Sequence, residues 1–490
     1  MKKQALYIET MGCQMNVLDS ELVAGQLRRA GYEPAVDMAS ADVVLINTCS
    51  VRDHAEKKAL SRIGQLKKPK QVNPDLIVGV IGCLAERDPE GLIAKVPHVD
   101  LICGPGELHK IPAMIEEVRA SRERVIALAS SQSRRGSLLE RSRQYDSLEA
   151  LELSREPAPG DRVLQSYIRV QRGCDKFCSF CVVPFTRGPE RSRAPQQIVD
   201  EARMLVDRGA KEVTLLGQTV NSYLNQQNGR TVRFSDLLER VAAVPGLERL
   251  RFVTSYPGDF TEDIFQAMRD LPPVCEYLHL PVQSGSDAVL KRMKRVYTVG
   301  RFVELIDRGR EMVPGITFAS DFIVGFCGET QAEFAETVAL IERCRFKNIF
   351  VFKYSERPGT VAAKRVPDDI PAEVKRRRNS ELLAMQKRIS LADHQALIGR
   401  TVEVLAEGYS KAATKAQQAE QARGDEVGWR RSDQLVGRTR GDRIVVFTGG
   451  PELIGRLVSI RITGATALTL FGDVVQAVAP SAGESLPIVA

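Results

Sequence analysis

The sequence feature that most limits the fold is a repeated alternation of short β-prone runs with amphipathic helical stretches. From the first residues to about Glu117 the β-prone runs are ALYIET, ADVVLINTC, DLIVGVIGC and VDLIC, and stretches such as Asp19 to Ala30 separate them. Strands that alternate with helices form parallel sheets, because each helix returns the chain to the same end of the sheet. We therefore predict a doubly wound parallel sheet over residues 1–125.

The same alternation resumes from Arg162 with six more candidate strands. They are SYIRVQ, EVTLLG, RLRFVTS, YLHLP, ITFASDFIVGF and NIFVFKYS, with helical patterns between them. Six consecutive strand and helix units fit a partial (β/α)6 barrel, whose active site would lie at the carboxyl ends of the strands. We assign this barrel to residues 161–397, including a long basic helical stretch at its end.

The remaining segments have other patterns. Residues 399–479 contain short alternating runs with Gly turns and little helical pattern, so we predict a small antiparallel β-barrel there. Residues 126–160 are rich in Ser, Arg, Gly and Pro, which is typical of a linker, and residues 480–490 form a tail. The chain is therefore predicted to be a multidomain α/β protein.

Composition narrows the class of protein. Of 490 residues, 43% are hydrophobic and 27% are charged, which excludes a disordered chain, and the longest apolar run, Leu76 to Ala85, is too short for a membrane span. No secretory signal is recognisable, so we expect a cytoplasmic protein without a membrane partner. In that compartment ten cysteines suit metal binding or redox chemistry better than disulfides. The net charge of +7 permits a polyanionic partner without proving one.

Three cysteines form a Cys-x3-Cys-x2-Cys motif directly after the first strand of the predicted barrel. Cys174, Cys178 and Cys181 stand in the segment QRGCDKFCSFCVVPFTRG, of which residues 173–186 are called here the radical loop. Three thiolates on one short loop can ligate three irons of an iron–sulfur cube and leave the fourth iron open to S-adenosylmethionine. Structural zinc would need a fourth ligand, and no His or fourth Cys lies near this loop in the sequence. A 4Fe–4S cluster with S-adenosylmethionine is the favoured interpretation.

A second set of cysteines is suggested by position. Cys13 follows ALYIET, Cys49 ends VVLINT and Cys83 ends LIVGVIG, so each lies at the carboxyl end of its own strand. Parallel strands end at one edge of a sheet, where open α/β folds bind ligands, so the three thiols could converge on one metal site. Glycines at 12 and 82 would let the backbone turn tightly around a bulky cofactor. Each Cys could equally be a small buried hydrophobe.

The other cysteines and the histidines carry less information. Four cysteines lie in or beside apolar stretches of the sequence and are expected in the hydrophobic core, namely Cys103, Cys275, Cys327 and Cys344. His279 in YLHLP is expected to be a strand residue rather than a metal ligand.

Several motifs resemble those of the radical S-adenosylmethionine methylthiotransferases, over nearly the whole chain. They are ETMGCQMNVLDSE, NTCSVRDHAEKKALSRIGQL, GVIGCLAER, RGCDKFCSFCVVPFTRGPERSR, LHLPVQSGSDAVLKRMKRVYT and SDFIVGFCGET. Residues 399–479 resemble the small RNA-binding barrel of that family, the TRAM domain. All six cysteines of the two sets fall on the family's motifs. The resemblance therefore implies two 4Fe–4S clusters, one on Cys13, Cys49 and Cys83 and one on the radical loop.

The segments GCQMN, NTCSVR and CVVPFTRG are similar to the branch that acts on isopentenylated adenosine 37 beside the tRNA anticodon. The resemblance implies that carbon 2 C–H of N(6)-isopentenyladenosine becomes C–S–CH3, with one S-adenosylmethionine as methyl donor and another as radical source. The expected partners are the tRNA anticodon loop, an electron donor and a sulfur donor. The branches that modify threonylcarbamoyladenosine or a ribosomal-protein aspartate stay open. An RNA-binding protein with non-catalytic clusters also stays open, although three ligands per cluster favour catalysis.

The resemblance implies six further residues that contact the cofactor or the substrate. Phe180 precedes the third cysteine of the radical loop, where the superfamily contacts the cofactor adenine. Gly217 and Gln218 end the second barrel strand, where its cofactor-amino-group motif lies. Near later strand ends, the candidate polar contacts to cofactor or substrate are Ser255, Gln283 and Asp321. Each of these residues could instead be a turn or capping residue.

Basic residues form a second group of candidates. Arg187, Arg191 and Arg193 follow the radical loop, and the segment KRMKR spans residues 291–295. Their side chains could hold phosphates or the cofactor carboxylate.

Overall fold

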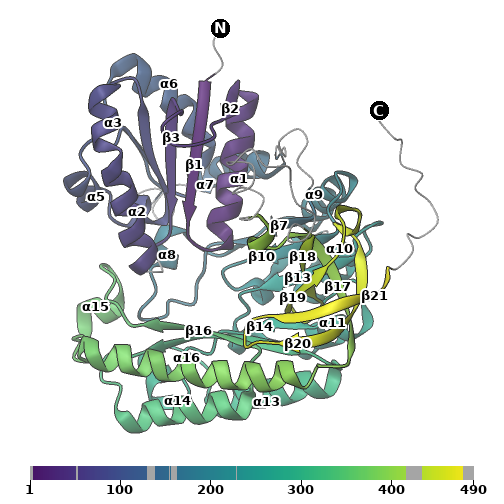
Figure 1. Cartoon of the computed structure of the whole chain (residues 1–490). Helices are drawn as coiled ribbons and strands as arrows, with labels where there is room; N and C mark the ends of the chain where they lie inside the picture. Colours follow the sequence, from purple (N-terminus) through teal and green to yellow (C-terminus); the bar gives the residue numbers. More distant parts are fainter. Residues whose placement is uncertain are drawn as a thin grey trace.

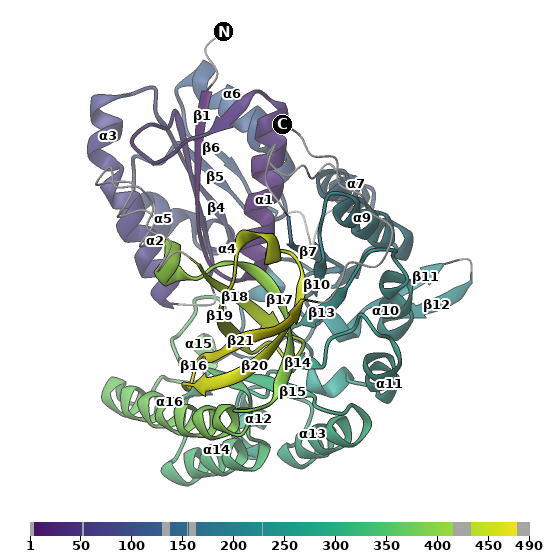
Figure 2. The ribbon, with the colours of Figure 1, turned by 45° about the vertical axis from the view of Figure 1, so that its right-hand side comes forward.

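The computed structural model describes residues 4–50, 53–129, 138–153, 155, 163–227, 229–414 and 433–477. An N-terminal α/β part, a larger partial barrel and a small β-barrel follow one another along the chain (Figure 1). The small barrel lies beside the larger one in both views (Figure 2). The predicted tail and parts of the predicted linker lie outside the described residues. In the part of the chain that is described, no helix is both long and apolar enough to cross a membrane.

Six parallel strands form the N-terminal sheet, in the order β2-β1-β3-β4-β5-β6. The strands are β1 (Gln4–Met11), β2 (Tyr32–Pro34), β3 (Val43–Thr48), β4 (Ile77–Gly82), β5 (Leu101–Cys103) and β6 (Val125–Ala127). The helices are α1 (Gln14–Arg29), α2 (Asp53–Gln65), α3 (Lys67–Val72), α4 (Cys83–Arg87), α5 (Pro89–Lys95), η1 (Leu108–Lys110) and α6 (Ile111–Ser121).

The two faces of this sheet belong to separate hydrophobic cores, because successive residues of a strand point to opposite faces. In β3, Val43 and Leu45 share a core with α1 and α6, whereas Val44 and Ile46 share a core with α2 and α4. Helices therefore cover both faces, and the predicted doubly wound sheet is confirmed.

The central part is a partial barrel with one strand at each of the six predicted places. Its strands are β7 (Gln165–Arg169), β10 (Glu212–Leu216), β13 (Arg249–Val253), β14 (Tyr277–His279), β15 (Thr317–Val324) and β16 (Asn348–Lys353). β7, β10 and β13 form one parallel sheet, and β14, β15 and β16 form another. A parallel bridge between Leu250 and Val274 links the two sheets.

Helices surround the outside of this barrel. The longer ones are α9 (Pro195–Asp207), α10 (Phe234–Ala242), α11 (Glu262–Asp270), α13 (Val299–Met312), α14 (Gln331–Cys344) and α16 (Ala372–Gln395). The shorter elements are β8 (Gln171–Arg172), α8 (Val183–Thr186), β9 (Arg191–Ser192), η2 (Val220–Ser222), β11 (Leu224–Gln227), β12 (Arg230–Arg233), η3 (Pro257–Asp259), α12 (Asp287–Arg292) and α15 (Val361–Arg365).

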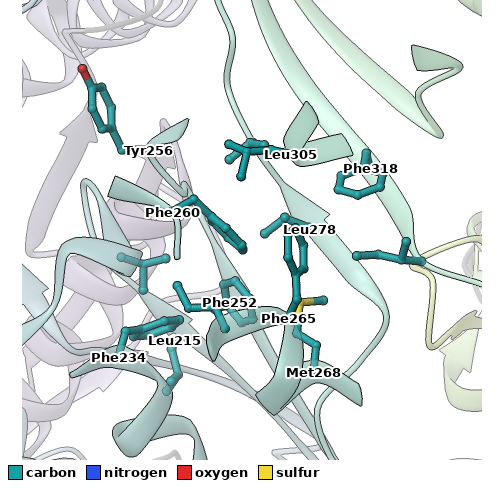
Figure 3. Packing of buried hydrophobic residues seen from close by; sticks show 14 of the residues in the cluster. Leu215, Phe234, Phe252, Tyr256, Phe260, Phe265, Met268, Leu278, Leu305 and Phe318 are labelled. Atoms are coloured by element: carbon teal, nitrogen blue, oxygen red, sulfur yellow. The ribbon is translucent and has the colours of Figure 1, made fainter. Parts of the chain in front are cut away.

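The barrel core lies between the strands and these helices and is rich in aromatic rings (Figure 3). Phe252 of β13 meets Phe234 of α10 edge to face, with ring centroids 5.1 Å apart. Phe260 and Phe265 pack at 4.7 Å in the same cluster. Such pairs contribute about 0.5–1.5 kcal/mol each beyond the burial of area. This outer core supports the strands whose carboxyl ends carry the candidate site.

The small barrel closes in the order β17-β18-β19-β21-β20. Its strands are β17 (Thr401–Tyr409), β18 (Gln434–Thr439), β19 (Ile444–Thr448), β20 (Leu457–Ala465) and β21 (Leu470–Ala477), with η4 (Pro451–Leu453) before β20. β18 is a strand that the sequence analysis did not identify. Four neighbouring pairs are antiparallel, as predicted, whereas β19 and β21 run parallel. The predicted closed barrel is confirmed with this refinement.

The turn between β18 and β19 docks against the amino ends of the strands of the larger barrel. Arg251 of β13 donates hydrogen bonds to the carbonyl oxygens of Thr439, at 2.8 Å, and Arg440, at 2.7 Å. Thr317 of β15 donates to the carbonyl oxygen of Gly441, at 2.9 Å. The small barrel is therefore attached at the end of the larger barrel opposite to the carboxyl strand ends.

The predicted linker contains a packed helix, α7 (Leu138–Leu153), which the sequence analysis treated as lying outside any core. Leu148 and Leu151 are buried, and Leu151 belongs to the core of the N-terminal sheet. Glu152 is fully buried and pairs with Arg172 at 2.6 Å. The carboxyl-terminal part of the helix is thus held partly by buried charge pairs, which leave no clear apolar stripe in the sequence, and this part of the predicted linker is a packed helix.

Candidate active site

The radical loop follows β8 at the carboxyl end of the first barrel strand. Gly173 has a φ of 65°, and a Cβ atom there would lie 2.0 Å from the carbonyl oxygen of Pro189, so only glycine allows this approach. Ser179 anchors the loop from two atoms, since its N–H donates to Met293 at 3.0 Å and its hydroxyl donates to Arg292 at 2.8 Å. These contacts hold the loop against the segment that contains KRMKR.

The three thiols of the radical loop lie close enough to influence one another. Burial, together with the neighbouring Cys178 and Cys174 thiols, raises the pKa of Cys181 to about 12. Burial likewise raises the pKa of Cys174 to about 11, with a contribution from Cys178. The structure therefore brings together the three cysteines that the spacing grouped.

The KRMKR segment has a divided role. Arg292 pairs with Glu333 at 2.8 Å, so a carboxylate already offsets its charge. The guanidinium of Arg295 turns towards the loop and lies 5.9 Å from the ring centroid of Phe180 and 5.1 Å from that of Tyr256. Because Arg295 also acts on the charge of Cys181, it is an inward-facing cation of the site.

The N-terminal cysteines converge at one edge of the sheet. Cys13 caps α1, the Cys49 N–H donates to the carbonyl oxygen of Met11 at 3.1 Å, and Cys83 begins α4 after β4. A hydrogen bond between the thiols of Cys13 and Cys49 lowers the pKa of Cys13 to about 6. Burial raises the pKa of Cys83, and the Arg187 charge opposes that shift. The three strand-end cysteines are thus gathered.

Buried amide side chains support these cysteines. Asn16 Nδ2 donates to Asn47 Oδ1 at 2.9 Å, and Asn47 Nδ2 donates back to the Asn16 carbonyl oxygen at 2.8 Å. Gly82 has a φ of 96°, and a Cβ atom there would lie 2.4 Å from Asn47 Oδ1. The sequence analysis did not single out the two asparagines, although they stand in the segments GCQMN and VVLINTC beside the cysteines.

The arginines after the radical loop are placed differently from the prediction. Arg187 is buried against the N-terminal cysteines, with Nη2 2.7 Å from Asp19 Oδ2. Arg193 is buried between Glu149, at 2.5 Å, and Glu201, at 2.7 Å. Both guanidinium groups already have acidic partners, which argues against the phosphate contacts considered for them from the sequence. Nothing in the local sequence distinguishes an inward from an outward arginine.

The transferred cofactor contacts lie at or near the strand ends. Gly217 follows β10, where a Cβ atom would lie 2.8 Å from the Cα of Val220, and Gln218 comes next. Ser255 is 2% exposed, and its hydroxyl has no hydrogen-bond partner among the described residues. Gln283 adopts a φ of 79° and its N–H donates to the Asp321 carbonyl oxygen at 2.8 Å.

Two more polar side chains belong to this region. Gln171 in β8 is fully buried, and neither polar atom of its side chain has a partner in the described parts of the chain. Gln171 lies close to Gly217, since a Cβ atom built on Gly217 would lie 3.1 Å from Gln171 Oε1. His279 Nε2 lies 3.0 Å from Asp321 Oδ1, on β14 and β15. His279 is a strand residue, as expected, and it is paired with a transferred site residue.

A cavity lies between the N-terminal part and the radical loop. Its volume is about 50 Å³, and Met15, Arg172, Thr186 and Arg187 are among its lining residues. The Thr186 hydroxyl is buried without a hydrogen-bond partner within the described ranges. The cavity therefore has polar groups along the chain segment that connects the two cysteine sites.

The donor sets favour clusters over single ions. Among the described residues, no three His, Cys, Asp or Glu side chains are placed to hold a single metal ion. No disulfide joins the ten cysteines, all of which are described. Soft thiols are the ligands of iron–sulfur clusters, and the irons of a cube need thiols spaced around it rather than meeting at one point. The soft-donor chemistry of the three thiols in each set suits such a group.

Comparisons with known proteins match each part of the chain. The model of the Uncharacterized protein family UPF0004 matches residues 5–104, that of the Radical SAM superfamily matches residues 168–341, and that of the TRAM domain matches residues 425–475. A tRNA-2-methylthio-N(6)-dimethylallyladenosine synthase of Rhodopirellula baltica is 47% identical over 477 residues, covering 96% of this chain and 95% of the relative. One of Moorella thermoacetica is 41% identical, covering 97% of this chain and 99% of the relative.

Among solved structures, the radical S-adenosylmethionine methyltransferase TsrM from Kitasatospora setae is similar at a TM-score of 0.49 and 15% identity. The match covers 74% of this chain and 77% of that one.

Proposed function

The chain belongs to the tRNA-2-methylthio-N(6)-dimethylallyladenosine synthases, tRNA methylthiotransferases of the radical SAM superfamily, and we propose that it methylthiolates carbon 2 of N(6)-isopentenyladenosine 37 in tRNA. The observation that carries the proposal is the presence of two separate three-thiol sites joined by one short segment, Val182–Arg187. A reaction that inserts sulfur and also removes an aromatic hydrogen needs two such functions.

We assign Cys174, Cys178 and Cys181 to the 4Fe–4S cluster that binds S-adenosylmethionine. When both are bound, the cluster and S-adenosylmethionine together supply a 5′-deoxyadenosyl radical, which can remove a hydrogen atom that lacks useful acidity. Ser179 anchors the loop, and the aromatic ring of Phe180 lies beside Arg295 at its inner side. The loop therefore presents three thiols from one rigid segment, as a catalytic cluster with one open iron requires.

We assign the second cluster to Cys13, Cys49 and Cys83. The Cys13 and Cys49 thiols are hydrogen bonded, and the Arg187 charge acts on Cys13 and Cys83. Cluster ligands must be deprotonated, so a nearby fixed cation favours binding. This cluster would hold the sulfur that is methylated and inserted.

We propose that the polar strand ends bind S-adenosylmethionine and the target base. Buried groups without protein partners are candidates for ligand contacts, since burying a polar group without a hydrogen bond costs about 1–3 kcal/mol. Ser255 and Gln171 meet that description, and Asp321 is oriented by His279. Phe180, Gly217, Gln218 and Gln283 complete the proposed set.

The remaining partners follow from the substrate. We propose that the small barrel contacts the tRNA, mainly through phosphate and shape, in line with the TRAM match. Because its β18–β19 turn is hydrogen bonded to β13 and β15, it would hold the RNA at a set position relative to the site. An electron donor and a sulfur donor complete the reaction, which we place in the cytoplasm with its tRNA substrate.

The test is anaerobic reconstitution with iron and sulfide, followed by reaction with isopentenylated tRNA, dithionite and S-adenosylmethionine. We expect about eight irons per chain, two cubes' worth, and a 2-methylthio nucleoside detected by mass spectrometry. Cys275→Ala, which changes a buried cysteine outside both sites, is the control and should keep full iron content and activity. Cofactor cleavage with no modified isopentenyladenosine, but modified threonylcarbamoyladenosine, would contradict the proposed substrate.

A further inference from the structure

Arg187 follows the radical loop in the sequence but lies among the N-terminal cysteines in space. It comes directly after α8, and its side chain is only 7% exposed. α8 packs against α4, the helix that begins with Cys83. A residue of the radical-loop segment is thereby inserted into the other cysteine site.

The charges around Arg187 are unevenly matched. Asp19 is fully buried and pairs with both Arg187 and Arg169. The single negative charge of Asp19 can offset only one of the two positive charges. Arg169 has a second carboxylate, that of Glu152, at 3.5 Å. The guanidinium of Arg187 acts on two further groups, which are the thiols of Cys83 and Cys13.

We propose that Arg187 is a positioning residue whose buried charge raises the reduction potential of the N-terminal cluster and helps to retain it. This inference rests on the second cluster of the proposed function. Reduction adds one electron, taken from the electron donor, and breaks no bond to the protein. A fixed positive charge stabilises the more negative, reduced form, and the effect is strong where water does not screen it. Charge and burial are among the recognised controls of cluster potentials.

The test is a redox titration of the full-length reconstituted protein, followed by electron paramagnetic resonance. Arg187→Gln removes the charge, and we expect the midpoint potential of the N-terminal cluster to become more negative. Arg187→Lys keeps a charge and should shift the potential less. Asp19→Asn removes the opposing carboxylate and should shift the potential in the positive direction. Proteins with alanine at all three cysteines of one site assign each signal to its cluster.

The control is Arg62→Gln, because Arg62 pairs with Glu9 at the surface of the same part of the chain and is 36% exposed. It should leave both potentials unchanged. Loss of the N-terminal cluster in Arg187→Gln but not in Arg187→Lys would also support the inference. An unchanged potential in Arg187→Gln, or equal loss of the cluster in both variants, would overturn it. A wild-type protein that holds only the radical-loop cluster would instead contradict the proposed function.

Discussion

The two cysteine sites differ in how the chain assembles them. The radical-loop thiols all come from Cys174–Cys181, whereas the N-terminal thiols come from three strand ends that meet only when the sheet forms. Their protonation differs too, since the pKa of Cys13 is lowered to about 6 and that of Cys174 is raised to about 11. The first site is formed by local sequence, and the second by tertiary structure and by a cation from another part of the chain.

The largest expected effect separates the two sites by function. We expect Cys174→Ala to abolish cleavage of S-adenosylmethionine, because the radical-loop cluster loses a ligand. Cys49→Ala should leave some cleavage and abolish methylthiolation. Both products, 5′-deoxyadenosine and the modified nucleoside, are measured by mass spectrometry. Equal and complete loss of cleavage in the two variants would contradict the division of labour.

Removal of a buried carboxylate between the two sites should destabilise the protein strongly. Glu152→Ala removes the buried carboxylate partner of Arg172 and leaves Arg169 with Asp19 alone, and breaking a buried ion pair typically costs about 3–5 kcal/mol. The shift of the urea midpoint measures it on the cluster-free protein. Glu304→Ala is the matched control, because Glu304 pairs with Arg301 at the surface and should cost at most about 1 kcal/mol. Similar midpoint shifts for both variants would show that the buried ion pairs contribute no more to the free energy of unfolding than a surface pair does.

The protonation difference predicts a difference in thiol reactivity in the cluster-free protein. At pH 7 Cys13 is mostly thiolate and Cys174 mostly thiol, so iodoacetamide should modify Cys13 faster, by about 100-fold after allowing for the lower nucleophilicity of a low-pKa thiolate. Below pH 6 Cys13 becomes protonated and its rate should fall. Peptide mapping over time gives both rates. Equal modification rates of Cys13 and Cys174 at pH 7 would contradict the difference in protonation between the two sites.

The smallest expected effect is on the binding of S-adenosylmethionine, which we assign to the site of the radical loop. Ser255→Ala should weaken binding of S-adenosylmethionine by about 2- to 12-fold, which is the usual worth of one hydrogen bond. Calorimetric titration of the reconstituted protein measures it. Ser166→Ala is the control, because Ser166 also has a buried hydroxyl without a described partner but lies near the amino end of β7. Equal weakening by both variants would show that Ser255 does not touch the cofactor.

The sequence predicted the sheet, the six barrel strands and the small barrel because alternating patterns of apolar residues follow directly from secondary structure. β18 was missed because residues 411–424, an insert rich in Ala and Gln, interrupt the strand pattern before it, and α7 was missed because buried ion pairs take the place of an apolar stripe. Gln171 was also missed, since a single amide before the radical loop looks like any other polar residue until its burial is known.

The sequence by itself determined the radical-loop site, because a Cys-x3-Cys-x2-Cys spacing brings three thiols together in any compact loop. It also placed Cys13, Cys49 and Cys83 at strand ends. Only the tertiary structure decided that these three thiols meet, and that Arg187 turns inward while Arg193 is held by Glu149 and Glu201. The physical reason is that a side chain's direction and charge partners depend on which elements pack around it, and those elements are distant in the sequence.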